Sequence, residues 1–118
     1  MFDELYCKTY VKTELSKQEL LDRIANIVDG QVNIRTIEAE IMAIDLVENE
    51  DYDAEKLNET DGFIYYPFYL EIDPVIKPSL SRQSYISGIS HLLEGLWNEL
   101  EDAVAACEFE DQLPSKET

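Results

Sequence analysis

The chain has 118 residues and 45% hydrophobic content, which is enough apolar material for one folded core and too little for two. Its formal net charge of −17 argues against nucleic acid as a direct partner and against acidic membrane surfaces, because such a field repels phosphate groups. We therefore expect one domain over residues 1–113 and a polar tail over residues 114–118.

The first part of the chain predicts a strand followed by a helix. Residues 5–13 (LYCKTYVKT) alternate in polarity and are rich in Tyr, Thr and Val, which is typical of a strand. A helix is expected to begin at Ser16, which forms a capping box with Glu19 ahead of apolar residues at helical spacing. Gly30 stands where the helix is expected to stop.

Residues 31–47 predict one long strand because β-branched side chains dominate the segment. The alternation changes parity between Ile34 and Ile37, which indicates a bulge or bend. The segment that follows, residues 48–61 (ENEDYDAEKLNETD), carries seven acidic side chains and a single Lys56. We interpret it as the tip of a hairpin and call it the acidic loop.

Residues 61–73 (DGFIYYPFYLEID) predict the next strand, and Pro67 indicates that this strand lies near a sheet edge or carries an irregularity. Its two faces are expected to hold Ile64, Tyr66, Phe68, Leu70 and Ile72 on one side, and Phe63, Tyr65, Tyr69, Glu71 and Asp73 on the other.

A second helix is expected from Ser81 to Asp102, with Gly88 and Gly95 on nearly the same face, where they allow close approach to the sheet. Residues 104–113 (VAACEFEDQL) predict a short last strand. The predicted core comprises Leu20, Ile24, Ile27, Ile41, Ile64, Phe68, Leu70, Ile89, Leu92, Leu93, Leu96, Leu100 and Phe109, with Trp97 at its margin.

The element order is strand, helix, strand, strand, helix, strand, which predicts an α+β ferredoxin-like βαββαβ sandwich. Both helices are expected on one face of an antiparallel-dominated sheet. The first and last strands would then be neighbours, which would bring Cys7 and Cys107 close together. We expect two reduced thiols there, with a functional disulfide as the alternative.

A cytoplasmic location is expected from two features of the sequence. No apolar stretch approaches the roughly 20 residues of a membrane helix, and the opening residues MFDELYCKTY lack the basic-then-apolar layout of a secretory signal.

Catalytic and metal-binding patterns are missing from the sequence. His91 is the single histidine, so a His-based triad or multi-histidine metal site is excluded, and we expect it to be solvated or hydrogen-bonded locally. Carboxylates in the acidic loop fit the first positions of a calcium-binding loop, but Lys56 replaces its turn glycine and Gly62 its bidentate glutamate. We expect no enzyme activity, no metal and no cofactor.

The charge itself is the strongest functional signal. Carboxylates crowded into one loop repel one another, and in return they steer a cationic partner towards the protein. We expect a basic protein partner to bind the acidic loop and one face of the following strand. The expected partner-binding residues are Glu48, Glu50, Asp51, Asp53, Glu55, Glu59, Asp61, Tyr65, Tyr69, Glu71 and Asp73.

Three stretches, YYPFYLEIDP, SYISGISHLLEGLWNELEDA and VAACEFEDQLP, give the C-terminal half a texture that resembles the small immunity proteins encoded beside bacterial polymorphic or contact-dependent toxins. The resemblance implies a cytoplasmic, non-enzymatic protein that binds and neutralises a cognate toxin, often a basic nuclease. It supplies no catalytic residues.

The leading interpretation is therefore an acidic inhibitor that blocks the active site of a basic toxin domain, with a nuclease as the expected class. Two alternatives stay open. One is a nucleic-acid mimic or anti-restriction protein that acts on a host DNA-binding protein, and the other is a small ferredoxin-like ligand-binding domain or enzyme that uses its sheet face.

Overall fold

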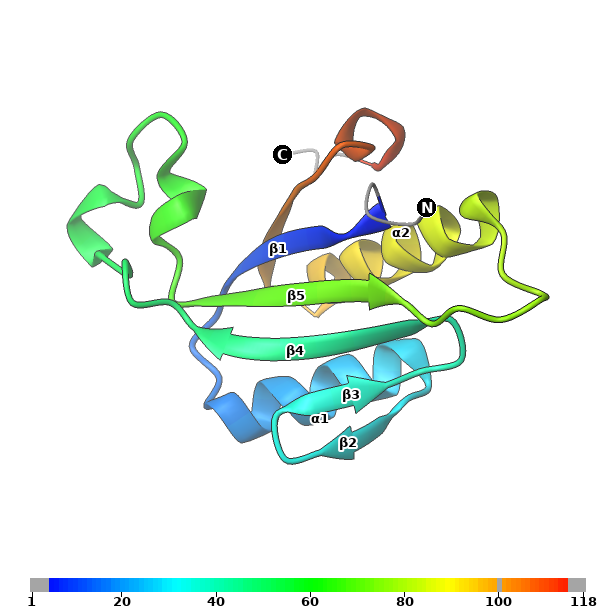
Figure 1. Ribbon diagram of the computed structural model, residues 1–118. Coiled ribbons are helices and arrows are strands. Elements are labelled where there is room, and N and C mark those ends of the chain that lie inside the picture. The colour runs from blue at the N-terminus through cyan, green and yellow to red at the C-terminus, as the bar shows by residue number, and fades with distance from the viewer. Residues whose placement is uncertain (1–4, 100, 115–118) are drawn as a thin grey trace.

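The computed structural model describes residues 5–99 and 101–114, which form an α+β fold with a fully antiparallel sheet (Figure 1). Within these residues the strand order is β2-β3-β4-β5-β1-β6. The strands are β1 (Cys7–Lys12), β2 (Gln31–Asn33), β3 (Thr36–Glu38), β4 (Met42–Glu48), β5 (Phe68–Pro74) and β6 (Asp102–Ala106), and the helices are α1 (Lys17–Val28) and α2 (Arg82–Asn98).

The start of α1 confirms the sequence prediction. The side chain of Ser16 accepts a hydrogen bond from the Glu19 amide, and the Glu19 side chain accepts one from the Ser16 amide. The helix ends in a left-handed residue as expected, but that residue is Asp29, with φ 54°, and not Gly30. Gly30 is needed for another reason: a Cβ there would lie 2.7 Å from Ile37 Cγ2.

The single strand predicted over residues 31–47 is wrong. The segment forms a short hairpin, β2 and β3, followed by the separate strand β4. The change of parity between Ile34 and Ile37 marks the hairpin turn, and Ile34 lies at its tip with φ 58° and 88% of its surface exposed. A two-residue turn flips the strand direction, which a bulge does not.

The strand predicted over residues 61–73 begins late. Residues Gly62–Tyr65 form a 3₁₀ turn, and β5 begins at Phe68, directly after Pro67. Pro67 does not mark an edge, because β5 lies between β4 and β1 in the middle of the sheet. The expected alternation holds from there on, with Leu70 and Ile72 buried and the intervening side chains on the opposite face.

The second helix begins as predicted, with Ser81 as its N-cap, and ends at Asn98, before the predicted Asp102. Asp102 is instead the first residue of β6, which ends at Ala106. The predicted last strand over residues 104–113 is therefore correct only for residues 104–106, because residues 107–113 form a turn with a 3₁₀ segment at Glu110–Gln112.

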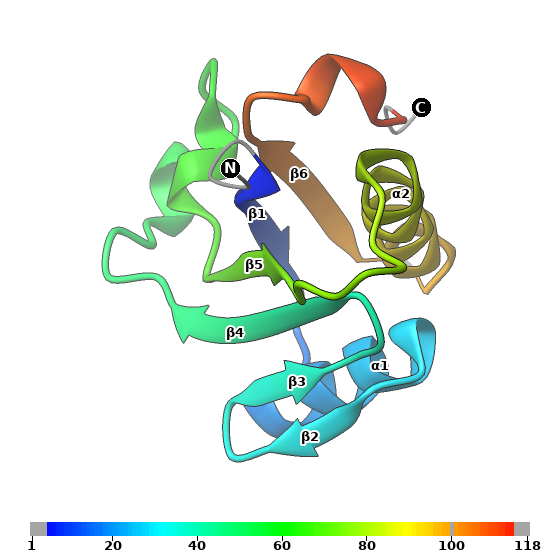
Figure 2. The same cartoon turned by 45° about the vertical axis from the view of Figure 1, so that its right-hand side comes forward.

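Both helices lie side by side on one face of the sheet (Figure 2). The imidazole Nε2 of His91 in α2 lies 3.0 Å from the Ile27 carbonyl oxygen in α1, so this exposed histidine makes its hydrogen bond across the helix pair and not locally. Gly95 permits the close approach of the helices, since a Cβ there would lie 2.6 Å from Ile27 Cγ2. Gly88 instead faces Met42 of the sheet.

The core lies between the helices and this face. Most predicted core residues are buried: Leu20, Ile24, Leu70, Ile89, Leu92, Leu93, Leu96 and Phe109. Ile27, Ile41, Phe68 and Trp97 are partly buried against the core. The prediction that Ile64 belongs to the core is wrong, because this residue lies in the 3₁₀ turn and is 39% exposed. Leu100 lies outside the described residues.

Candidate functional site

The acidic loop is an ordered structure rather than a simple hairpin tip, and Asn49 holds its two ends together. The Asn49 side-chain amide donates to the carbonyl oxygens of Ile64, at 2.9 Å, and Tyr66, at 2.7 Å. Its side-chain oxygen accepts from the Asp51 amide at 3.0 Å. One side chain therefore ties the start of the loop to the segment that leads into β5.

The interior of the loop is fixed by further local contacts. Asp53 begins a 3₁₀ turn at Ala54–Lys56 by accepting a hydrogen bond from the Glu55 amide. Gly62 packs against the loop backbone so closely that a Cβ there would clash with the Leu57 carbonyl oxygen. The Lys56 ammonium lies 4.9 Å from the centre of the Tyr65 ring, so the one basic residue of the acidic loop makes a cation–π contact with the turn that follows the loop.

The carboxylates of the loop differ in what they contact. Glu48 forms an ion pair with Lys17 at 3.7 Å, and Asp53 is the half-buried cap just described. The others, Glu50, Asp51, Glu55, Glu59 and Asp61, are exposed. The ordered backbone therefore presents a set of carboxylates to the solvent in a fixed arrangement.

The 3₁₀ turn that follows the acidic loop, Gly62–Tyr65, packs onto the sheet face opposite the helices, where Figure 2 shows it in green. Phe63 contacts Tyr10 edge-on, with ring centroids 5.4 Å apart, and Tyr10 lies 6.0 Å from Tyr69. The Lys8 ammonium is 4.1 Å from the centre of the Tyr69 ring. Tyr65 does not join this group, so the expected aromatic face of Phe63, Tyr65 and Tyr69 is correct only in part.

Glu71 and Asp73 lie on the same open face, further along β5. Glu71 accepts a hydrogen bond from the Tyr6 hydroxyl at 2.9 Å. Burial raises the pKa of Asp73, and the charges of Glu71 and Asp45 raise it further. These carboxylates therefore form a second acidic group, carried by the sheet and not by the loop.

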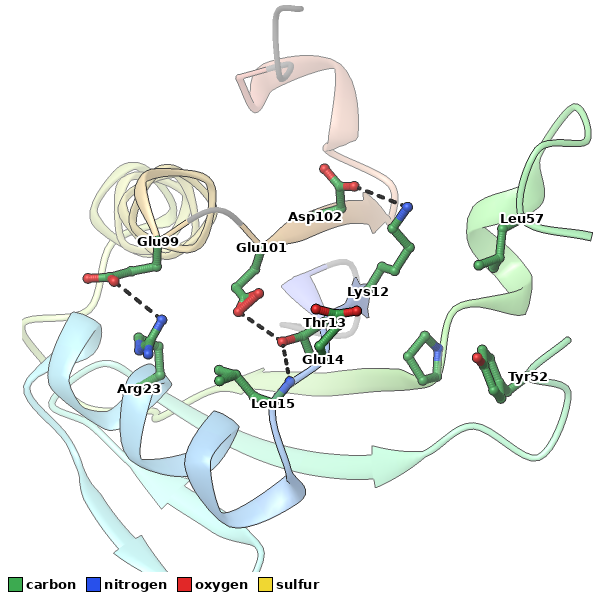
Figure 3. A pocket seen from close by; sticks show the side chains of 11 residues that line it. Lys12, Thr13, Glu14, Leu15, Arg23, Tyr52, Leu57, Glu99, Glu101 and Asp102 are labelled. Carbon is green, nitrogen blue, oxygen red and sulfur yellow. Dashed lines mark hydrogen bonds and ion pairs between the residues drawn. The ribbon is translucent and has the colours of Figure 1, made fainter. Parts of the chain in front are cut away.

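A cavity of about 660 Å³ opens beside the acidic loop, at the end of the sheet where β1 leads into α1 (Figure 3). Tyr52 and Leu57 of the loop line one end, and Arg23 and Glu99 line the other. The remaining wall residues are Lys12, Thr13, Glu14, Leu15, Pro67, Glu101 and Asp102. Its volume lies in the range of small-molecule and side-chain binding sites.

The charges in the cavity are partly compensated. Lys12 pairs with Asp102 at 3.6 Å, and Arg23 pairs with Glu99 at 3.3 Å. Glu101 is 8% exposed, and its carboxylate accepts a hydrogen bond from the Thr13 hydroxyl at 2.8 Å. Among the described residues, no ion pair involves Glu101.

The cavity lining therefore contains four carboxylates, those of Glu14, Glu99, Glu101 and Asp102, against two cationic side chains. This excess of negative charge suits a cationic group better than an anion. Within the described residues no cluster of three or more His, Cys, Asp or Glu side chains is arranged to hold a metal ion.

Sequence reasoning missed this cavity because its residues come from five separate segments: the end of β1 with the turn after it, α1, the acidic loop, Pro67 before β5, and the stretch from the end of α2 into β6. Its buried charged residue, Glu101, was expected to belong to the second helix, which in fact ends at Asn98. Its position beside Thr13 could be predicted only by knowing where α2 ends.

Comparisons with protein families, curated proteins and solved structures found no match for this chain. Neither helix of the described residues combines the length and apolar character needed to cross a membrane.

Proposed function

We propose that this protein is a toxin-neutralising immunity protein: it binds a basic toxin domain, with a nuclease as the expected class, and blocks the toxin's active site. In this proposal the protein acts by binding and not as an enzyme, and it works in the cytoplasm of a bacterium. The net charge of −17 supports a basic partner.

The observation that carries the proposal is the ordered state of the acidic loop beside a negatively lined cavity. A flexible acidic segment would lose conformational entropy on binding, whereas this loop is already fixed by Asn49 and Gly62. A basic side chain of the partner would enter the cavity towards Glu101, while the exposed loop carboxylates occupy the positions that phosphates take when the nuclease binds nucleic acid.

Affinity capture from the native cell, followed by purification of each basic protein recovered, tests this proposal. We expect one of them to be a toxin whose activity is lost when the present chain is added. Binding without inhibition, or recovery of no basic protein, would contradict the proposal.

Stopped-flow association with that toxin then tests the role of the loop. A variant with Glu50, Asp51, Glu55 and Glu59 changed to Gln or Asn should associate more slowly and with a weaker salt dependence, because exposed charges act mainly on encounter. The matched control neutralises four exposed carboxylates elsewhere, Glu94, Glu108, Glu110 and Asp111. Equal effects of both variants would assign the steering to net charge and not to the loop.

The cavity favours a second candidate function, the binding of a small cationic ligand. Its volume of about 660 Å³ and the buried Glu101 carboxylate are the observations that support it. Native mass spectrometry of the purified protein would distinguish the two, because a retained small molecule lost in the Glu101→Gln variant favours the ligand-binding function.

We also propose that the fold is built on a ferredoxin-like core. The strands β6, β1, β5 and β4 are neighbours in that order, and α1 and α2 are the connections on either side of the β4–β5 pair. This arrangement supports a ferredoxin-like core to which the hairpin of β2 and β3 has been added between α1 and β4.

A further inference from the structure

The two cysteines occupy facing positions on neighbouring strands. Strands β1 and β6 pair antiparallel, with Lys8 opposite Ala106 and Thr9 opposite Ala105. One step beyond this register places Cys7 opposite Cys107, the residue that follows β6. Directly opposed residues of an antiparallel pair have the Cα separation that a disulfide requires.

The side chains confirm this placement. Cys7 points into the core and is fully buried, and the Cys107 side chain packs against the same core while it stays partly exposed. The Thr9 hydroxyl lies 3.4 Å from the Cys7 sulfur. Both cysteines are in the free thiol form.

The surroundings make the two thiols chemically different. The pKa of Cys107 is lowered, first because the Cys7 thiol donates a hydrogen bond to its sulfur and further because the Phe109 amide does so. The pKa of Cys7 is raised by the same hydrogen bond and by burial. Cys107 is therefore the accessible nucleophile, and Cys7 is a buried thiol next to it.

We propose that Cys7 and Cys107 form a reversible intramolecular disulfide by exchange with a small-molecule disulfide. The Cys107 thiolate attacks one sulfur of the small disulfide, the S–S bond of that reagent breaks, and its first half leaves as a thiolate. The Cys7 thiol then loses its proton and attacks Cys107, which releases the second half as a thiol. Two protein thiols are oxidised, and one small disulfide is reduced to two small thiols.

The bond would connect the first strand to the segment after the last strand, and it would close a loop over nearly the whole chain. That segment already contributes Phe109 to the core, where its ring lies 6.1 Å from that of Tyr85. Oxidation would therefore restrict the unfolded chain far more than it would change the folded one, so a higher melting temperature is expected.

The test treats the reduced full-length protein with glutathione disulfide near neutral pH. We expect both free thiols to disappear, the mass to fall by two hydrogen atoms, and the product to remain a single chain on a non-reducing gel. The melting temperature should rise by several degrees, and dithiothreitol should reverse all of these changes.

Two variants separate the roles of the thiols. Cys7→Ala should stop at a mixed disulfide on Cys107, and Cys107→Ala should leave Cys7 unreacted in the folded protein. The proposal is overturned if wild type keeps both thiols, stops at the mixed disulfide, forms only intermolecular dimers, or gains no thermal stability on oxidation. The measurements on wild type test the proposal even if a variant fails to fold.

Discussion

Replacing Asn49 by Ala should loosen the acidic loop more than any other single change in its side-chain contacts. The substitution removes two donated hydrogen bonds, to the Ile64 and Tyr66 carbonyl oxygens, and one accepted from the Asp51 amide. No apolar core contact is lost, because Asn49 is only half-buried.

The magnitude follows from the exposure of the three bonds. The bond to Tyr66 is partly buried, and its loss is expected to cost about 1 kcal/mol, whereas water can replace the partners of the two exposed bonds at a smaller cost. The total is about 2 kcal/mol of unfolding free energy, measured by urea denaturation. Asn58→Ala is the matched control, because Asn58 is an exposed loop residue of the same type.

Hydrogen exchange locates the effect. The Asp53 amide, which donates to the Tyr65 carbonyl oxygen, should lose protection in Asn49→Ala while the core strands keep theirs. Asn49→Asp adds a second check, since its carboxylate still accepts from Asp51 but no longer donates to Ile64 or Tyr66. If Asn49→Ala were as stable and as protected as Asn58→Ala, the loop would be held by something other than this side chain.

Three further predictions concern single positions. Thr13→Val should lower the unfolding free energy by about 1–3 kcal/mol in urea denaturation, because the buried Glu101 carboxylate loses its donor, and Thr13→Ser should restore most of it. Asp73→Asn should be more stable than wild type at pH 7: a raised folded pKa disfavours folding above that pKa, and this cost vanishes as the pH falls through it, so the difference between the two proteins should shrink on acidification. A less stable variant at pH 7 would refute the assigned cause. Gly62→Ala should cost about 1–3 kcal/mol and speed proteolysis within the loop, since the new methyl group meets the Leu57 carbonyl, and unchanged proteolysis would contradict this.

The fold class was predictable because local signals agree with the tertiary structure over most of the chain. The capping box at Ser16 and the apolar stripe of α2 need no distant partner to be recognised. The hairpin at Ile34 was not predictable, because a β-branched residue with positive φ is uncommon and no Asn-Gly or Asp-Gly pair announces the turn.

The candidate site was predictable only where it is contiguous in sequence. The acidic loop was found by its composition, but its internal order depends on Asn49, whose side chain reaches residues 15 and 17 positions later. The split between Tyr65 and Tyr69 follows from the late start of β5, since a 3₁₀ turn breaks the alternation that a continuous strand would impose. The cavity could not be predicted, because five segments that are distant in the sequence meet to form it.

The position of β1 in the sheet has a consequence for synthesis on the ribosome. This strand emerges before both of its neighbours, which come from residues 68–72 and 102–106. At roughly 5–20 residues per second, β1 waits several seconds for β5 and longer for β6, with its backbone donors and acceptors unpaired. Such distant pairing slows folding and favours misassembly between nascent chains. Mutual repulsion between these acidic chains opposes that misassembly.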